Sequence, residues 1–137
     1  MQEERITPES VEEWAGTYRN TWETADSQAA AELFTPDGTY RDDIYQDPNR
    51  GREGVVTYWE KGTSAQSNAA VRMGKLSVDD DRAVVEFWTT MRPDDEPVTA
   101  TGPPLLRFSG GDGLCRSLRE YWNSGEGHVD PAGEWGT

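Results

Sequence analysis

A glutamate near the end of the sequence is the first candidate for chemistry. Glu120 alternates with Leu118 and Trp122, so the three side chains share one face of an expected strand. If that face is inward, Glu120 is a buried carboxylate, and a lone buried charge is costly enough to demand a partner. The arginines that could supply the partner are Arg72, Arg107 and Arg119. The sequence does not choose among them, nor between a structural ion pair and a catalytic group.

A tyrosine and an aspartate in the first third of the chain are the other two candidates. Tyr18 follows Val11 and Trp14 at helical spacing, on the apolar face of an expected helix. A phenol there is either a packed core residue with a satisfied hydroxyl or a donor to a developing oxyanion. Asp42 adjoins Asp43 at the end of a short expected strand. One of the two is a solvated carboxylate at a rim, and the one that faces an apolar pocket becomes a better base.

The sequence carries no pattern for metal, cofactor or thiol chemistry. It has no Cys/His cluster, no phosphate-binding glycine loop and no dinucleotide motif after a strand. Residues 110–113 are glycine-rich but lie between two expected strands, where a hairpin turn explains them. Cys115 has no histidine near it in the sequence, and His128 lies in the C-terminal tail. We therefore predict no metal and no cofactor, and a histidine mechanism would require the tail to fold over the pocket.

Length and charge narrow the class of protein. The chain has 137 residues, the usual size of one domain, and 13 Lys and Arg against 26 Asp and Glu give a net charge of −13. This balance argues against nucleic acid or an anionic membrane as partner, and no apolar run is long enough to span a bilayer. The charged N-terminus and the single cysteine predict a cytoplasmic protein. Arginine is far commoner than lysine, which is typical of a high-GC bacterial genome.

Helical signals fill the first half of the chain. Thr7 is a credible N-cap, with Pro8 at the first helical position, for a helix that runs to about residue 24. Asp26 can cap a second, short helix, which the turn at residues 35–38 ends. A short strand follows at residues 39–43, and a third helix begins after about residue 51.

The period changes to two in the second half. Segments at about 69–78, 83–92, 97–108 and 114–123 read as strands joined by short turns. Helices followed by an antiparallel meander predict an α+β fold with the helices on one face of a curved sheet. We expect one domain at residues 1–124. The Gly-rich segment 125–137 is expected to be a tail, ordered only if Trp135 or Val129 finds a groove.

Three segments, in this order, resemble the SnoaL-like branch of the nuclear transport factor 2-like superfamily. They are Ala31–Tyr40, Gly51–Val55 and Leu118–Trp122, and the similarity covers about residues 9–123. The resemblance implies a cone, in which a strongly bent antiparallel sheet wraps the N-terminal helices and leaves an apolar pocket at its open end. It also implies a homodimer through the outer sheet face. Members include polyketide cyclases, ketosteroid isomerases, scytalone dehydratase, limonene-type epoxide hydrolases and many non-catalytic proteins, so the fold alone does not decide the chemistry.

The resemblance suggests roles for two residues. Tyr18 and Asp42 match the spacing of two functional residues of ketosteroid isomerases, a phenol that binds the oxyanion and an aspartate that shuttles the proton. The isomerases' second, protonated aspartate is replaced here by Pro104. Arg72 has no acid two residues away, unlike the Asp-Arg-Asp arrangement of the epoxide hydrolases. Both departures weaken the match to those particular reactions.

The preferred function is cofactor-independent acid–base catalysis on a small hydrophobic carbonyl compound, by a cyclase, isomerase or dehydratase. Asp42 would be the general base, Tyr18 the oxyanion donor, and Glu120 with an arginine the second polar wall. The side chains expected to line the pocket are Trp14, Trp22, Phe34, Tyr40, Trp59, Phe87, Thr89, Leu105, Leu118 and Trp122. The alternatives are a non-catalytic ligand-binding or dimer-scaffold protein of the same fold, and an accessory protein that binds a partner through its sheet face.

Overall fold

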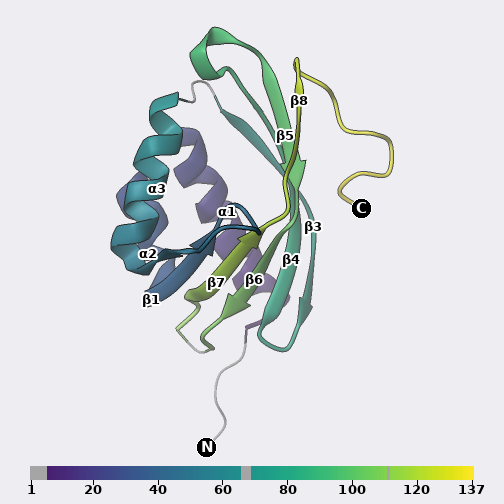
Figure 1. Ribbon diagram of the computed structural model, residues 1–137. Helices are drawn as coiled ribbons and strands as arrows, with labels where there is room; N and C mark the ends of the chain where they lie inside the picture. Colours follow the sequence, from purple (N-terminus) through teal and green to yellow (C-terminus); the bar gives the residue numbers. More distant parts are fainter. Residues whose placement is uncertain (1–5, 66–68, 111) are drawn as a thin grey trace, which may run out of the picture.

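A computed structural model of the chain describes residues 6–65, 69–110 and 112–137 (Figure 1). The charged start of the sequence and Gly111 of the expected turn lie outside these residues. The described part contains three α-helices: α1 (Pro8–Thr24), α2 (Ser27–Glu32) and α3 (Gly51–Ala65). Its eight strands are β1 (Phe34–Arg41), β2 (Asn49–Arg50), β3 (Ala70–Asp79), β4 (Arg82–Met91), β5 (Val98–Gly102), β6 (Pro104–Phe108), β7 (Cys115–Glu120) and β8 (Asn123–Glu126). A short 3-10 turn, η1 (Pro93–Asp95), joins β4 to β5.

Local capping sets the helix boundaries that the sequence predicted. The Thr7 hydroxyl accepts the Ser10 backbone N–H at 3.1 Å, and the Ser10 hydroxyl accepts the Thr7 backbone N–H at 2.9 Å. Ala25 then ends α1 in the left-handed conformation, with φ of 56°. The Asp26 carboxylate caps α2 by accepting the Ala29 N–H at 3.0 Å. Each of these interactions joins residues close in sequence.

The expected turn at residues 35–38 is wrong. These residues belong to β1, where they form a bulge between the two stretches that pair with β7, at Phe34 and from Thr39 onward. The carbonyl oxygen of Leu33 accepts the Cys115 backbone N–H at 2.9 Å, which draws the start of β1 into the sheet. Pairing on both sides of the bulge converts turn-forming residues into a strand irregularity, and the strand ends at Arg41 rather than at residue 43.

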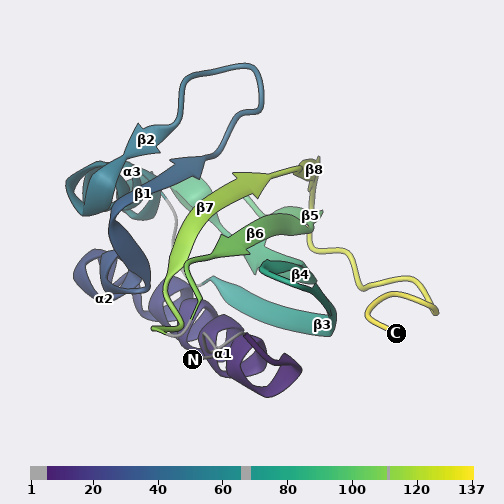
Figure 2. The same cartoon turned by 90° about the horizontal axis from the view of Figure 1, so that it is seen from below.

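The sheet is mixed and not closed. Its strands run in the order β2-β1-β7-β6-β4-β5-β8, with β3 on β4, and β1 pairs with β7 in parallel while the other pairs are antiparallel. This confirms the α+β cone and corrects the expectation of an entirely antiparallel sheet. Figure 2 shows the sheet curving around α1. None of the described helices is long and apolar enough to cross a membrane.

A break in one expected strand creates the bend near the site. The segment expected at 97–108 is divided at Pro103 into β5 and β6, and β4 pairs with both of them in succession. Gly102 ends β5 where the backbone of Tyr121 approaches closely, and a Cβ at this position would collide with the Tyr121 carbonyl oxygen. Glycine is therefore required at the end of β5, because the chain between β7 and β8 passes directly beside it.

The C-terminal tail is ordered on the outer face of the sheet. β8 pairs with β5, and beyond it the Trp88 indole N–H donates to the Val129 carbonyl at 2.8 Å. The Trp135 ring packs edge-on against Trp88 with centroids 5.7 Å apart, and the Lys75 backbone N–H donates to the Gly136 carbonyl at 2.8 Å. Both Val129 and Trp135 thus find partners. In Figure 1 the tail lies on the side of the sheet opposite to the helices.

Candidate active site

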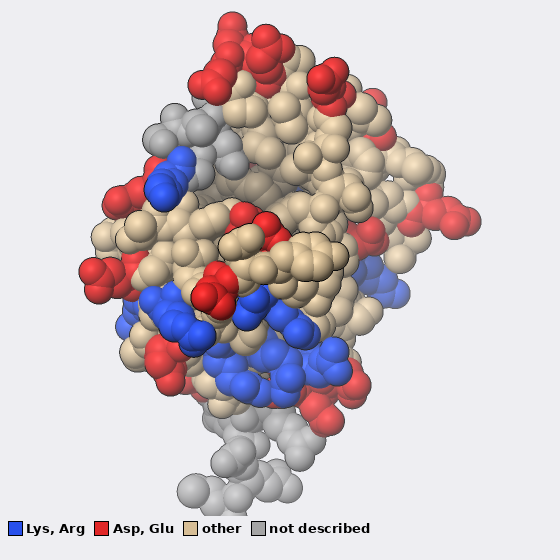
Figure 3. Space-filling model, viewed as in Figure 1, with Lys and Arg blue, Asp and Glu red and all other residues tan. Residues whose placement is uncertain are grey.

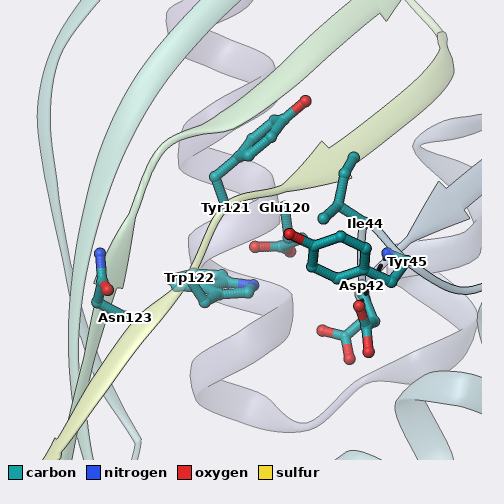
Figure 4. A pocket seen from close by; sticks show the side chains of 8 residues that line it. Asp42, Ile44, Tyr45, Glu120, Tyr121, Trp122 and Asn123 are labelled. Atoms are coloured by element: carbon teal, nitrogen blue, oxygen red, sulfur yellow. Dashed lines mark hydrogen bonds between the residues drawn. The ribbon is translucent and has the colours of Figure 1, made fainter.

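An open cavity of about 540 Å³ lies between the loop after β1 and the chain that leaves β7 (Figure 4). Two short segments supply its walls, residues 42–45 and residues 120–123. Tyr45 at the mouth is 91% exposed, whereas Glu120 is only 2% exposed. The cavity therefore leads from solvent to a single buried carboxyl group.

Two phenols hold one oxygen of that carboxyl group. The Tyr40 hydroxyl donates to Glu120 Oε1 at 2.6 Å, and the Tyr18 hydroxyl lies 3.3 Å from the same oxygen and 3.1 Å from the Tyr40 hydroxyl. Tyr18 and Tyr40 are 1% and 3% exposed. The other oxygen, Oε2, is buried and has no hydrogen-bond partner among the described residues. The carboxyl group is thus held by the phenols through Oε1, while Oε2 is buried at the cavity wall without a hydrogen-bond partner among the described residues.

Burial gives Glu120 an unusual pKa. Desolvation raises the pKa to about 8, and the nearby charge of Asp42 raises it as well. Hydrogen bonds from Tyr40 and Tyr18 lower it, and the indole of Trp122 acts in the same direction, without the geometry of a full hydrogen bond. The effect of desolvation on the pKa is larger than that of the hydrogen bonds, so the carboxyl group keeps its proton at neutral pH. Because Oε1 accepts the phenols and Oε2 has no hydrogen-bond partner among the described residues, Oε2 is the oxygen on which a proton fits.

A second carboxyl and phenol pair stands beside the first. The Tyr58 hydroxyl hydrogen-bonds the half-buried Asp42 carboxylate, and burial followed by this contact raises the Tyr58 pKa well above its usual range. The Tyr58 ring packs on the Tyr40 ring with centroids 4.8 Å apart, so the two pairs are in direct contact. Among the described residues, no group of three His, Cys, Asp or Glu side chains is arranged to hold a metal ion.

Aromatic packing fixes the position of Tyr18. Its ring stacks on Trp14 at 5.1 Å and meets Trp59 and Phe87 at 5.5 Å each. Trp22 lies 6.2 Å from Tyr18 and connects it to the cavity wall, because Trp22 also packs on Trp122 at 5.5 Å. The phenol beneath Glu120 therefore has little freedom to move.

The structure spreads the expected lining residues over several environments. Trp122 lines the cavity, and Trp22 is half-buried against it. Trp14, Phe34, Tyr40, Trp59, Phe87, Thr89 and Leu118 are buried within the core. Leu105 is wrong as an inward residue. Its neighbour Leu106 is fully buried, so strand alternation turns Leu105 to the outer face.

The expectation of an arginine beside Glu120 is also wrong. Arg107 binds Asp81 at 3.1 Å, and Asp81 in turn binds Arg116 at 2.7 Å. Arg72 is exposed, and Arg119 pairs in register with Arg41 on the face opposite to Leu118. Figure 3 shows basic side chains gathered over β1, β7 and β6. Since burial keeps Glu120 protonated and the phenols satisfy Oε1, no counter-charge is needed.

Sequence reasoning missed most of the cavity wall. Asp43, Ile44, Tyr45, Tyr121 and Asn123 line the cavity together with the predicted Asp42, Glu120 and Trp122. Both adjacent aspartates line the cavity, and Asp43 is the exposed carboxylate at its rim. Two inward-facing tyrosines, at positions 18 and 40, were the available signal that Glu120 could be held by phenols rather than by an arginine.

Comparison with known proteins agrees with this architecture. The chain has an α+β cone fold with an open cavity beside its sheet, and the family profile described as SnoaL-like domain matches residues 15–116. The chain belongs to the SnoaL-like domain family. No curated protein sequence matches it.

Solved structures resemble the chain in fold. A protein with a ketosteroid isomerase-like fold from Catenulispora acidiphila, in complex with trimethylamine, has a TM-score of 0.71 and 23% identity over 85% of this chain and 86% of its own. The epoxide hydrolase/cyclase-like enzyme SalBIII, which has a role in pyran ring formation in the polyether salinomycin, has a TM-score of 0.75 and 21% identity over 86% of this chain and 96% of its own.

Proposed function

We propose that this protein is a cofactor-independent acid–base catalyst that acts on a small, largely hydrophobic carbonyl compound bound in the cavity. The observation that carries the proposal is Glu120, a buried carboxyl group at the cavity wall whose pKa of about 8 leaves it protonated and whose Oε2 has no hydrogen-bond partner among the described residues. A buried acid with a pKa near the working pH is suited to donate and accept protons.

In the proposed reaction Glu120 is the general acid and Asp42 is the general base. Glu120 Oε2 gives its proton to the substrate carbonyl oxygen while the Asp42 carboxylate removes a proton from the adjacent carbon, which yields the enol. Return of a proton to another carbon, with Glu120 taking back the hydroxyl proton, yields an isomer. Ring closure and loss of water use the same donor and acceptor. Tyr40 and Tyr18 act on Glu120, since both are buried behind it.

The comparisons support a reaction of this kind. SalBIII is cyclase-like and another neighbour was solved with a small molecule, so the fold can serve both ring-forming chemistry and small-ligand binding. Because each shares less than a quarter of its residues with this chain, these names indicate the kind of chemistry rather than a substrate.

Hydrogen–deuterium exchange tests the proposal without knowledge of the natural substrate. The probe is 2-indanone in D2O, with deuterium uptake at its α-carbon followed by proton NMR. We expect the wild type to accelerate uptake, with a rate that falls as the pH rises through the pKa of Glu120. Glu120→Gln and Asp42→Asn should each lose the acceleration, and Asp130→Asn, an exposed change on the tail, should keep it. If the wild type binds 2-indanone but gives only the background rate, a non-catalytic ligand-binding protein is the correct alternative.

We also propose that the chain forms a homodimer through the uncovered part of the outer sheet face and acts in the cytoplasm. The tail covers the outer side of β3 and of β4 near Trp88. The outer face of β4 near Val84, together with β6 and β7, remains uncovered. Val84 is 38% exposed there and Leu105 is half-buried beside it. Light scattering of the wild type and of Val84→Asp tests this: a monomeric wild type contradicts it.

A further inference from the structure

The charges around the cavity have one sign. Among its eight lining residues, Asp42, Asp43 and Glu120 carry carboxyl groups and none is a lysine or arginine. The Arg41 guanidinium donates to the carbonyl of Gln46, next to Tyr45 on the same loop, but it is not part of the cavity wall, and Arg119 faces outward. The whole chain carries a charge of −13, so its long-range field also attracts cations. Local and global electrostatics therefore favour the same class of ligand.

Aromatic rings stand on both sides of the buried carboxyl group. In Figure 4 the Tyr45 ring and the Trp122 indole flank Glu120 from opposite walls. Tyr45 belongs to no strand or helix and keeps 91% of its surface exposed, so its ring contributes almost nothing to the core. Ring faces attract cations with dispersed charge, and tryptophan and tyrosine do so best.

One turn couples the mouth carboxylate to that ring. Asp43 Oδ1 accepts the Tyr45 backbone N–H at 2.9 Å, which sets the carboxylate and the ring on the same short loop. Asp42 is engaged by the Tyr58 hydroxyl, whereas Asp43 is exposed at the rim. Asp43 is therefore the carboxylate left for a ligand charge. Oε2 of Glu120, buried at the cavity wall, has no hydrogen-bond partner among the described residues, so it can interact with a polar group of a ligand that reaches this depth.

We propose that the ligand of this cavity carries an organic cation, a quaternary or protonated amine, which Asp43 and the Tyr45 ring hold at the mouth while the neutral part of the ligand reaches Glu120. The orientation of the ligand rests on the proposed function, but recognition of the cation does not. A metal ion fits less well, because hard cations take six or more oxygen ligands and the wall offers aromatic carbon instead. An organic ammonium group suits both the carboxylate and the rings.

A charged and a neutral molecule of the same shape test the proposal. Choline and 3,3-dimethylbutan-1-ol differ in one atom, a positive nitrogen replaced by carbon. Calorimetric or NMR titration at low salt should give choline a dissociation constant about tenfold lower than that of the alcohol, the combined effect of one carboxylate and one ring. Raising the salt to 150 mM should weaken choline binding and leave the alcohol unchanged, because only the charged probe is screened.

Matched variants locate the binding group. Asp43→Asn should weaken choline binding about fivefold, with the alcohol unaffected, and Asp130→Asn, the same loss of charge on the outer-face tail, should change neither. Tyr45→Leu keeps apolar bulk but removes the ring and should also weaken choline alone. If the alcohol binds as tightly as choline, if choline does not bind up to about 50 mM, or if Asp43→Asn has no effect, the proposal is overturned.

Results that contradict the proposed catalytic function can be distinguished from results that contradict the cation site. Glu120→Gln should abolish deuterium exchange in 2-indanone, whereas Asp130→Asn on the outer-face tail should leave both the exchange and choline binding unchanged. Cation binding without any exchange in the wild type would retain the cation site and discard the catalyst. Exchange without discrimination between the two probes would do the reverse.

Discussion

Replacing Glu120 by glutamine should make the protein more stable at alkaline pH. The folded-state pKa of Glu120 is about 8, against an ordinary value of 4.5. Between these two values the folded chain holds a proton that the unfolded chain has released, so stability falls as the pH rises. The stabilisation is fully present below about pH 4.5 and is lost as the pH passes 8. At about 1.4 kcal/mol per pH unit, the whole interval is worth about 5 kcal/mol.

The Glu120→Gln variant removes this pH dependence of the unfolding free energy and changes little else in the structure. A glutamine amide has nearly the same shape, its oxygen can still accept the Tyr40 hydroxyl, and it does not titrate. About 4 kcal/mol of the interval lies between pH 5 and pH 9. The difference in unfolding free energy between variant and wild type should therefore shift by about 4 kcal/mol in favour of the variant over that range. Taking the difference cancels every other titrating group that the two chains share.

Urea unfolding at pH 5, 7 and 9, followed by tryptophan fluorescence, measures the effect. Glu12→Gln on the exposed side of α1 is the matched control for the loss of one carboxyl group. A shift below about 1 kcal/mol for Glu120→Gln would mean that Glu120 ionises in the folded state as it does in the unfolded chain. The reasoning about the buried acid, and with it the proposed catalyst, would then be refuted.

Three further changes probe the supports of the site. Tyr40→Phe removes a hydrogen bond that favours the charged carboxylate, so the pKa of Glu120 should rise by about one unit in a carboxyl carbon-13 NMR titration, and a fall would contradict the assignment. Gly102→Ala should cost about 2 kcal/mol or more in urea unfolding, because its Cβ collides with the carbonyl that follows β7, whereas Gly16→Ala inside α1 meets nothing and should stabilise by about 0.5–1 kcal/mol. Trp135→Ala should expose the tryptophan ring on β4 to acrylamide quenching without changing affinity at the cavity; altered ligand binding would contradict the placement of the tail on the outer face.

Interactions between close neighbours in the sequence explain why the helices were predictable. The caps at Thr7 and Asp26 and the apolar stripe of α1 involve residues three or four apart, and they appear where expected. The bulge in β1 was not predictable. Residues 35–38 have the composition of a turn, and the β7 residues that pair with the strand on either side of them lie about 80 positions away. Strand pairing overrides local turn preference when both flanks of the segment are held in a sheet.

The order of the C-terminal tail also depends on contacts with residues distant in the sequence. The sequence predicted a tail without periodicity from residue 125, and in the structure its first two residues belong to β8. Its order comes from β5 and from the indole of Trp88, which hold the backbone of residues 123–129 by hydrogen bonds. His128 in consequence donates its Nε2–H to the Met91 carbonyl at 2.9 Å on this side of the sheet, and it is absent from the wall of the cavity.

The sequence by itself determined the class of fold and the family, and it placed Glu120 on one strand face with Leu118 and Trp122, because periodicity and alternation place a side chain on a face regardless of what lies opposite. Only the tertiary structure decided what Glu120 meets there. Its partners Tyr40 and Tyr18 are 80 and 102 positions away, and the arginines that composition offered are turned to the other side of the same strands. Alternation specifies the face of a strand, whereas the choice between a phenol and a guanidinium depends on which strands and helices the folded chain brings together. That choice separates a neutral buried acid from an ion pair.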